Sequence, residues 1–249
     1  PQGERAQSPW LFAFLKDPTV MKIRPWMSVR MPTFHFTDQE ASMLVAGFAA
    51  EGDEPQFDTY QLANLPARNI AIGREVFNML RCQQCHAVNA VDPANPPVPN
   101  TADTTSLAPN LTLSKLRLRH DWIADWIRRP DEHIPGTRMP TNFPRDGETG
   151  GFQSPLAQAL ASPQFAASRA SLRPHFESDE ALQKTMADAV ALTNYLRDYI
   201  WSIGVDRMRA PGVQGAPPFP LVPHQQQQQQ QLPTTPAATP GLQTARLNQ

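Results

Sequence analysis

Five consecutive residues, Cys82-Gln83-Gln84-Cys85-His86, carry two thiols and an imidazole within about one helical turn. This is the Cys-x-x-Cys-His spacing to which haem c is attached. On one turn each thiol can form a thioether with one haem vinyl group, and the imidazole that follows can reach the iron. The pattern therefore predicts covalent haem attachment by Cys82 and Cys85, with His86 as the proximal iron ligand.

Three other kinds of site use closely spaced cysteines, and the chain argues against each. A structural zinc site needs four ligands, usually with a second Cys or His pair, but the sequence has only two cysteines. A thioredoxin-like pair follows a strand in a βαβ unit, whereas this pair follows a run with helical periodicity, Ala71 to Leu80. A structural disulfide within Cys-x-x-Cys would be strained. Haem attachment is thus the interpretation that fits best.

A six-coordinate haem iron needs a second axial ligand, and a methionine thioether is the one that raises the reduction potential. Met139 lies in Ile134-Pro135-Gly136-Thr137-Arg138-Met139-Pro140, where proline and glycine predict an irregular loop. Most methionines fill apolar cores, but no apolar stripe surrounds this one. Met139 is therefore the candidate distal ligand, and His133, slightly earlier in the chain, is the strongest substitute.

The motifs occur in the order helix, Cys-x-x-Cys-His, Pro-Asn-Leu, tryptophan-bearing helix, Gly-Thr-Arg-Met-Pro and final helix. This order resembles the class I cytochrome c family over residues 67–205. The resemblance implies an all-α fold with long loops, one haem c with His/Met ligation, and electron transfer. In the family a proline carbonyl accepts a hydrogen bond from the proximal imidazole, and Pro109 occupies the matching position in this chain. Ala108 precedes it where many relatives have glycine, so we expect the turn to differ locally.

Periodicity independently predicts the helices that position these residues. A first helix covers the run before Cys82, and a final helix begins at the cap Ser178 and stops near Gly204. In the family that this chain resembles, the first and last helices cross closely where a small residue lies beside an aromatic one, and Gly73 and Tyr195 are the candidates for that contact. Between them, a short helix from Asp121 to Arg129 carries Trp122 and Trp126 on one face, and it ends at Pro130.

An internal repeat extends the resemblance toward the beginning of the chain. Trp10 to Pro18 matches Trp122 to Pro130, and Arg30-Met31-Pro32-Thr33 matches Arg138-Met139-Pro140-Thr141. We therefore predict that residues 1–50 are the C-terminal half of a preceding cytochrome c-like domain, whose front half is missing before Pro1.

Met31 is then a candidate axial ligand of a second haem, one absent from this chain unless the upstream half is present. The alternative is a methionine that fills a core which no longer binds haem. After Met31, Thr37 and Glu40 predict a capping box for a helix through Leu44 and Phe48.

The other segments connect or enlarge these parts. Residues 51–66 are predicted to be a linker, and residues 206–249, rich in proline and glutamine, a disordered tail. The segments 87–107 and 144–177 enlarge the domain between its motifs. Three further histidines are expected at the surface: His120, His133 and His175.

Composition limits the classes of function. A formal net charge of −1 argues against a nucleic-acid-binding protein. No apolar run of about eighteen residues occurs that would span a membrane. The chain starts at Pro1 without an export signal, which suggests a mature or incomplete polypeptide. The resemblance implies a periplasmic or outward-facing location, since bacteria attach haem c outside the cytoplasmic membrane.

Three hypotheses follow. The leading one is an electron carrier, rather than a catalyst by itself, that moves single electrons between redox partner proteins of a respiratory chain. The second is the cytochrome module of a larger oxidoreductase, in which other domains of a longer chain are the partners. The third is a haem enzyme or gas sensor with an open distal site, which requires Met139 to be displaced.

Overall fold

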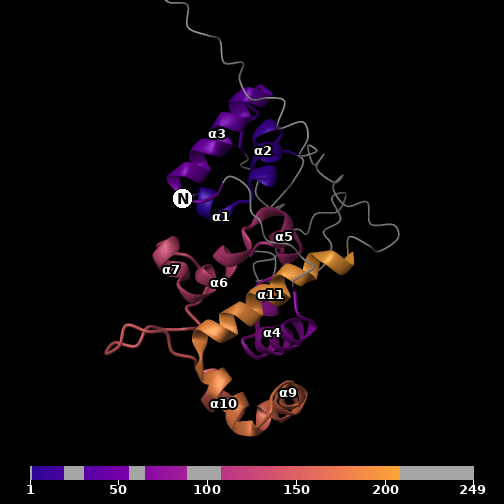
Figure 1. Cartoon of the computed structure of the whole chain (residues 1–249), viewed down its shortest axis with the longest axis vertical. Coiled ribbons are helices and arrows are strands. Elements are labelled where there is room, and N and C mark those ends of the chain that lie inside the picture. The colour runs from indigo at the N-terminus through magenta and orange to yellow at the C-terminus, as the bar shows by residue number, and fades with distance from the viewer. Residues whose placement is uncertain (1, 20–30, 56–64, 89–107, 208–249) are drawn as a thin grey trace, which may run out of the picture. The chain divides into compact units, whose positions relative to one another are not determined.

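A computed structural model of the chain describes residues 2–19, 31–55, 65–88 and 108–207, which lie in one compact unit (Figure 1). These residues form helices and no β-strand, only isolated β-bridges, so the predicted all-α class is confirmed. The helices are α1 (Gln2–Arg5), α2 (Ser8–Lys16), α3 (Asp38–Glu51), α4 (Ala67–Met79), α5 (Ser114–Arg117), α6 (His120–Arg128), α7 (Pro130–His133), α8 (Leu156–Leu160), α9 (Ala166–Leu172), α10 (Asp179–Ala187) and α11 (Ala189–Arg207), with 3-10 turns η2 (Cys82–Gln84), η4 (Leu111–Leu113), η5 (Pro163–Phe165) and η6 (Arg173–His175).

The largest apolar core forms where α4 and α11 cross, and Figure 1 shows α11 in orange over α4 in purple. Ile72, Val76 and Phe77 of α4 pack in one cluster with Leu192 and Leu196 of α11, and all five side chains are fully buried. Ile72 and Val76 are four residues apart, as are Leu192 and Leu196, so each pair lies on one helix face. Burial of this apolar area stabilises the crossing.

Gly73 permits the close approach of the two helices. A Cβ at this position would lie 2.0 Å from the carbonyl oxygen of Tyr195 and 2.7 Å from the Cβ of Tyr199. A side chain therefore cannot be accommodated without moving one helix. The predicted contact of Gly73 with Tyr195 is confirmed.

The predicted single final helix is wrong, because the chain breaks at Asp188. Ser178 caps α10 as predicted, accepting a hydrogen bond from the N–H of Ala181 at 3.0 Å. Asp188 is extended, and its carboxylate accepts from the N–H groups of Val190 and Ala191 at 2.9 and 3.0 Å. A side chain that caps a new helix in this way competes with helix continuation. The predicted stop near Gly204 is also wrong, since α11 continues to Arg207.

The tryptophan-bearing helix forms as predicted. It begins one residue earlier than expected, at His120, and Pro130 follows its end as the first residue of α7. Trp122 and Trp126 stack on each other with ring centroids 5.2 Å apart. Both rings are half-buried against the core that holds α4 and α11.

Helices α2 and α3 pack against each other around a second, smaller core. The predicted capping box at the start of α3 is confirmed: Thr37 N–H donates to the Glu40 carboxylate at 2.8 Å, and Glu40 N–H donates to the Thr37 hydroxyl at 3.2 Å. The buried members of this core are Ala6, Trp10, Leu11, Leu15, Ala41 and Val45.

The enlarging segment 144–177 contains α8, α9 and the 3-10 turns η5 and η6. Leu156, Leu160 and Leu172 supply its apolar anchors, and all three are buried in the main core. Residues 56–64, 89–107 and 208–249, which include most of the predicted linker, loop 87–107 and tail, lie outside the described residues. Among the described helices, none combines the length and apolar character needed to cross a membrane.

Candidate functional site

The Cys-x-x-Cys-His residues form a tight turn directly after α4. Leu80 ends that helix, and Arg81 adopts the left-handed conformation with φ 56°, so the chain reverses into η2. The carbonyl of Cys82 then accepts hydrogen bonds from the N–H groups of Cys85 and His86, at 3.2 and 3.0 Å. The turn thereby holds both thiols and the imidazole on one short segment.

The two cysteines differ in environment. Cys82 is half-buried against the main core, whereas Cys85 is exposed, and both are free thiols. Burial raises the pKa of the Cys82 thiol to about 12. Since the thiolate is the reactive form in disulfide exchange and metal binding, Cys82 is protonated at neutral pH and poorly suited to either. Two reduced thiols fit thioether formation with two vinyl groups.

His86 is oriented by a backbone carbonyl. Its Nδ1 lies 2.9 Å from the carbonyl oxygen of Pro109, which can only accept, so Nδ1 carries the proton. Burial lowers the pKa of His86, although the bond to Pro109 opposes this effect. The ring is therefore neutral at pH 7, with its lone pair on Nε2. No hydrogen-bond partner of Nε2 occurs among the described residues. This tautomer is the one required of an iron ligand that binds through Nε2.

The turn that carries Pro109 is held on both sides. The N–H of Leu111 donates to the carbonyl of Ala87 at 2.9 Å, which ties the turn to the residue after His86. Asn110 is buried, and its side-chain oxygen accepts from the N–H and the hydroxyl of Thr112 at 3.0 and 2.8 Å. Local hydrogen bonds thus fix the carbonyl that orients the imidazole.

Met139 ends an irregular loop that follows α7. Gly136 has φ 77°, a conformation that favours glycine, and the N–H of Thr137 donates to the carbonyl of Ile134 at 3.1 Å. Met139 N–H donates to the Thr137 hydroxyl at 3.3 Å. Its side chain is half-buried against the same core that Cys82 contacts. Sequence reasoning placed Met139 apart from any apolar stripe, and the structure shows that the loop brings it to the core.

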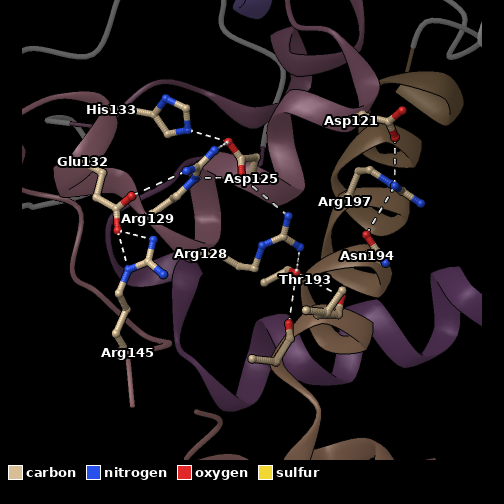
Figure 2. A network of polar contacts seen from close by, with 12 residues as sticks. Asp121, Asp125, Arg128, Arg129, Glu132, His133, Arg145, Thr193, Asn194 and Arg197 are labelled. Carbon is tan, nitrogen blue, oxygen red and sulfur yellow. Dashed lines mark hydrogen bonds and ion pairs between the residues drawn. The ribbon is translucent and has the colours of Figure 1, made fainter. Parts of the chain in front are cut away.

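A polar network connects side chains of α6 and α7, the helices that precede this loop in the sequence (Figure 2). Asp125 of α6 lies at its centre, accepting from Arg129 at 2.6 and 2.9 Å and from His133 Nε2 at 2.7 Å. Burial alone would raise the pKa of the Asp125 carboxyl, but hydrogen bonds from Arg129 and His133 outweigh it and hold the pKa below its usual value. His133 also lies near the rings of Trp122 and Trp126, so it belongs to this network.

The same network reaches α11 and the segment after Met139. Figure 2 shows Arg128 donating to the Thr193 hydroxyl at 2.8 Å, which joins α6 to α11. Glu132 binds Arg145 at 2.7 Å, which joins α7 to the chain beyond the loop. The network therefore connects α6 and α7, which precede the Met139 loop, to α11 and to the segment that follows the loop.

Two of the buried polar residues were missed by sequence reasoning. His120, expected at the surface, is 2% exposed, and its Nε2 lies 3.2 Å from the carboxylate of Asp198. Asp198 also accepts from Asn69 at 2.8 Å and from Arg197 at 3.0 Å. These contacts join α4, α6 and α11. In the sequence, Arg197 and Asp198 interrupt the apolar residues of the final helix, and this interruption was the available signal. It did not indicate that Asp198 is buried.

Met31 lies in the second core. Its side chain is half-buried with Phe36 and the buried residues of α2 and α3. This position is compatible with both predicted roles of Met31, filling the core or acting as an axial ligand. Residues 20–30, directly before it, lie outside the described residues.

Comparison with known proteins identifies the family of the central region. Residues 70–150, which contain the Cys-x-x-Cys-His turn, Pro109 and Met139, match the cytochrome c family. No curated protein and no solved structure matches the chain significantly. In the part of the chain that the structure describes, no group of three or more His, Cys, Asp or Glu residues could hold a metal ion. The two free thiols and the Nε2 atom of His86 fit a covalently attached haem. The match supports a c-type cytochrome domain in this region and haem-based electron transfer as its general role.

Proposed function

We propose that this protein transfers single electrons through a haem c held by Cys82 and Cys85, with His86 and Met139 as axial ligands. The observation that carries the proposal is the 2.9 Å contact between His86 Nδ1 and the Pro109 carbonyl. It fixes the tautomer that presents Nε2, and no role in substrate binding or proton transfer is needed to explain it. We further propose that the domain spans residues 67–205.

The bound haem supplies a one-electron couple whose potential depends on its ligands and burial. The chain's own residues set both. Pro109 strengthens the imidazole as a ligand by accepting its Nδ1 proton in a hydrogen bond. A thioether from Met139 favours the ferrous state. The half-buried rings of Trp122 and Trp126 add apolar surface near the loop that carries Met139.

Met139 is favoured over His133 as the distal ligand because of what each side chain does. His133 donates its Nε2 proton to Asp125 at 2.7 Å and lies against two tryptophan rings. Recruiting that nitrogen to iron would break the hydrogen bond and leave Asp125 with one partner fewer. Among the described residues, no hydrogen bond to the Met139 side chain is present, so ligation would break none there. An open distal site, as in a haem enzyme or gas sensor, would leave this thioether without a role.

The family context suggests partners and location. We propose that the partners are redox proteins of a respiratory chain or other domains of a longer polypeptide. The setting we propose is the periplasmic or outward-facing side of a bacterial membrane, where haem c is attached.

The experiment is spectroscopy of the haem-loaded protein and of two single variants. Met139→Ala should abolish the near-infrared charge-transfer band of ferric haem with a thioether ligand, lower the reduction potential, and allow carbon monoxide to bind the ferrous form. His133→Ala should keep the band. Absence of the band from the unaltered protein, or its persistence in Met139→Ala, would reject Met139 as the ligand. Carbon monoxide binding by the unaltered protein would instead favour the open-site alternative.

A further inference from the structure

Two segments that are far apart in the sequence contact each other about a local two-fold axis. Ala6 and Leu118 form an antiparallel bridge, and they are equivalent in the register that aligns Trp10 with Trp122. Two backbone hydrogen bonds of 2.8 Å flank this bridge, and each is the counterpart of the other: Gln7 N–H to the Arg117 carbonyl, and Arg119 N–H to the Arg5 carbonyl.

Side chains repeat the same relationship. Arg117 lies over the ring of Trp10 at 5.4 Å, and its counterpart Arg5 lies over the ring of Trp122 at 5.9 Å. Each tryptophan stacks on an aromatic ring one turn later: Trp10 on Phe14 at 4.8 Å, and Trp122 on Trp126 at 5.2 Å. The Gln7 side chain donates to the Lys115 carbonyl, and the Arg119 side chain donates to the equivalent Gly3 carbonyl at 2.6 Å.

The helices correspond in length and order as well. Helices α1 and α5 both have four residues, and α2 and α6 both have nine. Helices α3 and α11 both start at a side-chain N-cap, Thr37 and Asp188 respectively. Counted from these caps, the same positions are buried in each helix: Ala41, Val45 and Ala49 in α3, and Leu192, Leu196 and Ile200 in α11.

The correspondence ends at one helix face. In α11 the neighbouring face carries Tyr195 and Tyr199, and α4 covers it. The matching positions in α3 are Leu44 and Phe48. Helix α1 approaches α3 at Phe48, where a Cβ at Gly3 would lie 1.8 Å from the Phe48 carbonyl oxygen, but no described helix covers Leu44 in the way that α4 covers Tyr195. Leu44 is 38% exposed and the adjacent Met43 is 58% exposed.

Two further observations mark this face as open. A Cβ at Gly47, on the same side of α3, would have no heavy atom of the described part of the chain within 4 Å. Phe34, just before α3, is 57% exposed. Large apolar side chains gathered at such a level of exposure mark a surface that binds another apolar surface.

We propose that the face of α3 formed by Phe34, Met43, Leu44 and Gly47, here called the open α3 face, docks a haem-bearing helix of the α4 kind. This helix ends in its own Cys-x-x-Cys-His turn and carries a second haem c. In the central domain the attachment helix precedes α5, so its counterpart precedes α1 in the same polypeptide. Residues 2–51 are then the second half of another cytochrome unit, and Met31 supplies its distal ligand as Met139 does.

The inference rests on the proposed function in one respect: it takes the relation of α4 to α11 as that of a haem-attachment helix to its partner. The test uses the complete reading frame that encodes this chain, expressed in a host that attaches haem c. Mass spectrometry of haem-bearing peptides counts the attachment sites. The near-infrared methionine-to-iron band, measured per mole of protein, counts the thioether ligands.

Two haem-bearing peptides are expected, one with residues 82–86 and one from ahead of residue 2. Leu44→Lys should keep both haems, because attachment needs only the local motif, but should halve the methionine–iron band as the helix leaves the open α3 face. Met31→Ala should halve it as well. Ala46→Lys, the same change of charge on another side of α3, should keep the full band.

Several results would overturn the inference. One is a single haem-bearing peptide, containing residues 82–86, which would leave the proposed function intact. Another is a full methionine–iron band in Leu44→Lys or in Met31→Ala. Absence of haem from residues 82–86, with haem found only upstream, would reject the proposed function instead.

Discussion

The carbonyl oxygen of Tyr195 lies only 2.0 Å from the position that a Cβ of residue 73 would occupy. Gly73 therefore allows the backbones of α4 and α11 to come into direct contact. This crossing sets the position of the Cys-x-x-Cys-His turn relative to the rest of the domain, since that turn follows α4 almost directly. Tyr199 contributes to the same junction through an edge-on contact with Phe77, with ring centroids 5.2 Å apart.

Gly73→Ala should destabilise the protein by about 1–3 kcal/mol, the range for overpacking a close contact. Gly47→Ala, measured in this 249-residue chain without the proposed docking helix, is the matched control, because Gly47 is also within a helix but a Cβ there meets no atom of the described residues within 4 Å. The control should be neutral or stabilising by up to about 1 kcal/mol, owing to the better helix propensity of alanine. Chemical denaturation followed by helical circular dichroism measures both. Equal effects of the two changes would show that the crossing at Gly73 is not tight.

Local signals in the sequence were sufficient for the attachment turn and for several helix ends. The Cys-x-x-Cys-His motif, the capping box of Thr37 and the cap of Ser178 each depend on residues within one turn of each other. Periodicity predicted the two helices that carry Gly73 and Tyr195, but their close crossing was expected only from the resemblance to the cytochrome c family.

Features that depend on distant partners were not predictable. The apolar period continues from α10 into α11, so the sequence gives no sign that the Asp188 carboxylate caps a new helix. The burial of His120 depends on Asp198, 78 residues later, and on the ring of Trp201. A histidine at the start of a charged helix is usually exposed, and only the tertiary contact with α11 buries this one.

Asn110→Ala should weaken the hydrogen bond between His86 Nδ1 and the Pro109 carbonyl, although it alters neither of these residues. The Asn110 side chain caps η4 and fixes the turn that presents the Pro109 carbonyl. We expect a loss of about 1 kcal/mol in the free energy of unfolding, typical of a lost cap. A shift of the Nδ1–H resonance of the ligand imidazole and a change in reduction potential should accompany it. Asn78→Ala, at an exposed position of α4, is the control; unchanged Nδ1–H resonance and potential in Asn110→Ala would contradict the role.

Asp125→Asn should destabilise the α6–α7 region and remove part of the acid sensitivity of the protein. The free energy of unfolding should fall by about 1–3 kcal/mol, because the substitution weakens the hydrogen bonds that Arg129 and His133 donate to the charged Asp125 carboxylate. Because the pKa of Asp125 is depressed in the folded state, its contribution is complete above the ordinary value of 3.8 and is lost as the pH falls through the folded pKa.

The measurement is the free energy of unfolding between pH 7 and pH 3 in the parent protein and in Asp125→Asn. The difference between them should be largest near neutral pH and should shrink below about pH 4. Asp131→Asn, a matched change at an exposed position of α7, should show no such convergence. A difference that stays constant down to pH 3 would mean that the Asp125 charge does not stabilise the fold.

Arg119→Ala should loosen the junction between residues 2–51 and the central domain. The Arg119 side chain is 4% exposed and donates to the carbonyls of Gly3 at 2.6 Å and Pro55 at 2.8 Å. Removing it leaves the carbonyl of the buried Gly3 without this donor, which is costly. Hydrogen exchange should then become at least about tenfold faster at the amides of Gln7 and residue 119, which are bonded across the junction. The amide of Phe77 within α4 should not change, nor should any of the three in Arg74→Ala, an exposed position on that helix. Unchanged exchange at Gln7 would show that the backbone bridge between Ala6 and Leu118 holds the junction without the arginine.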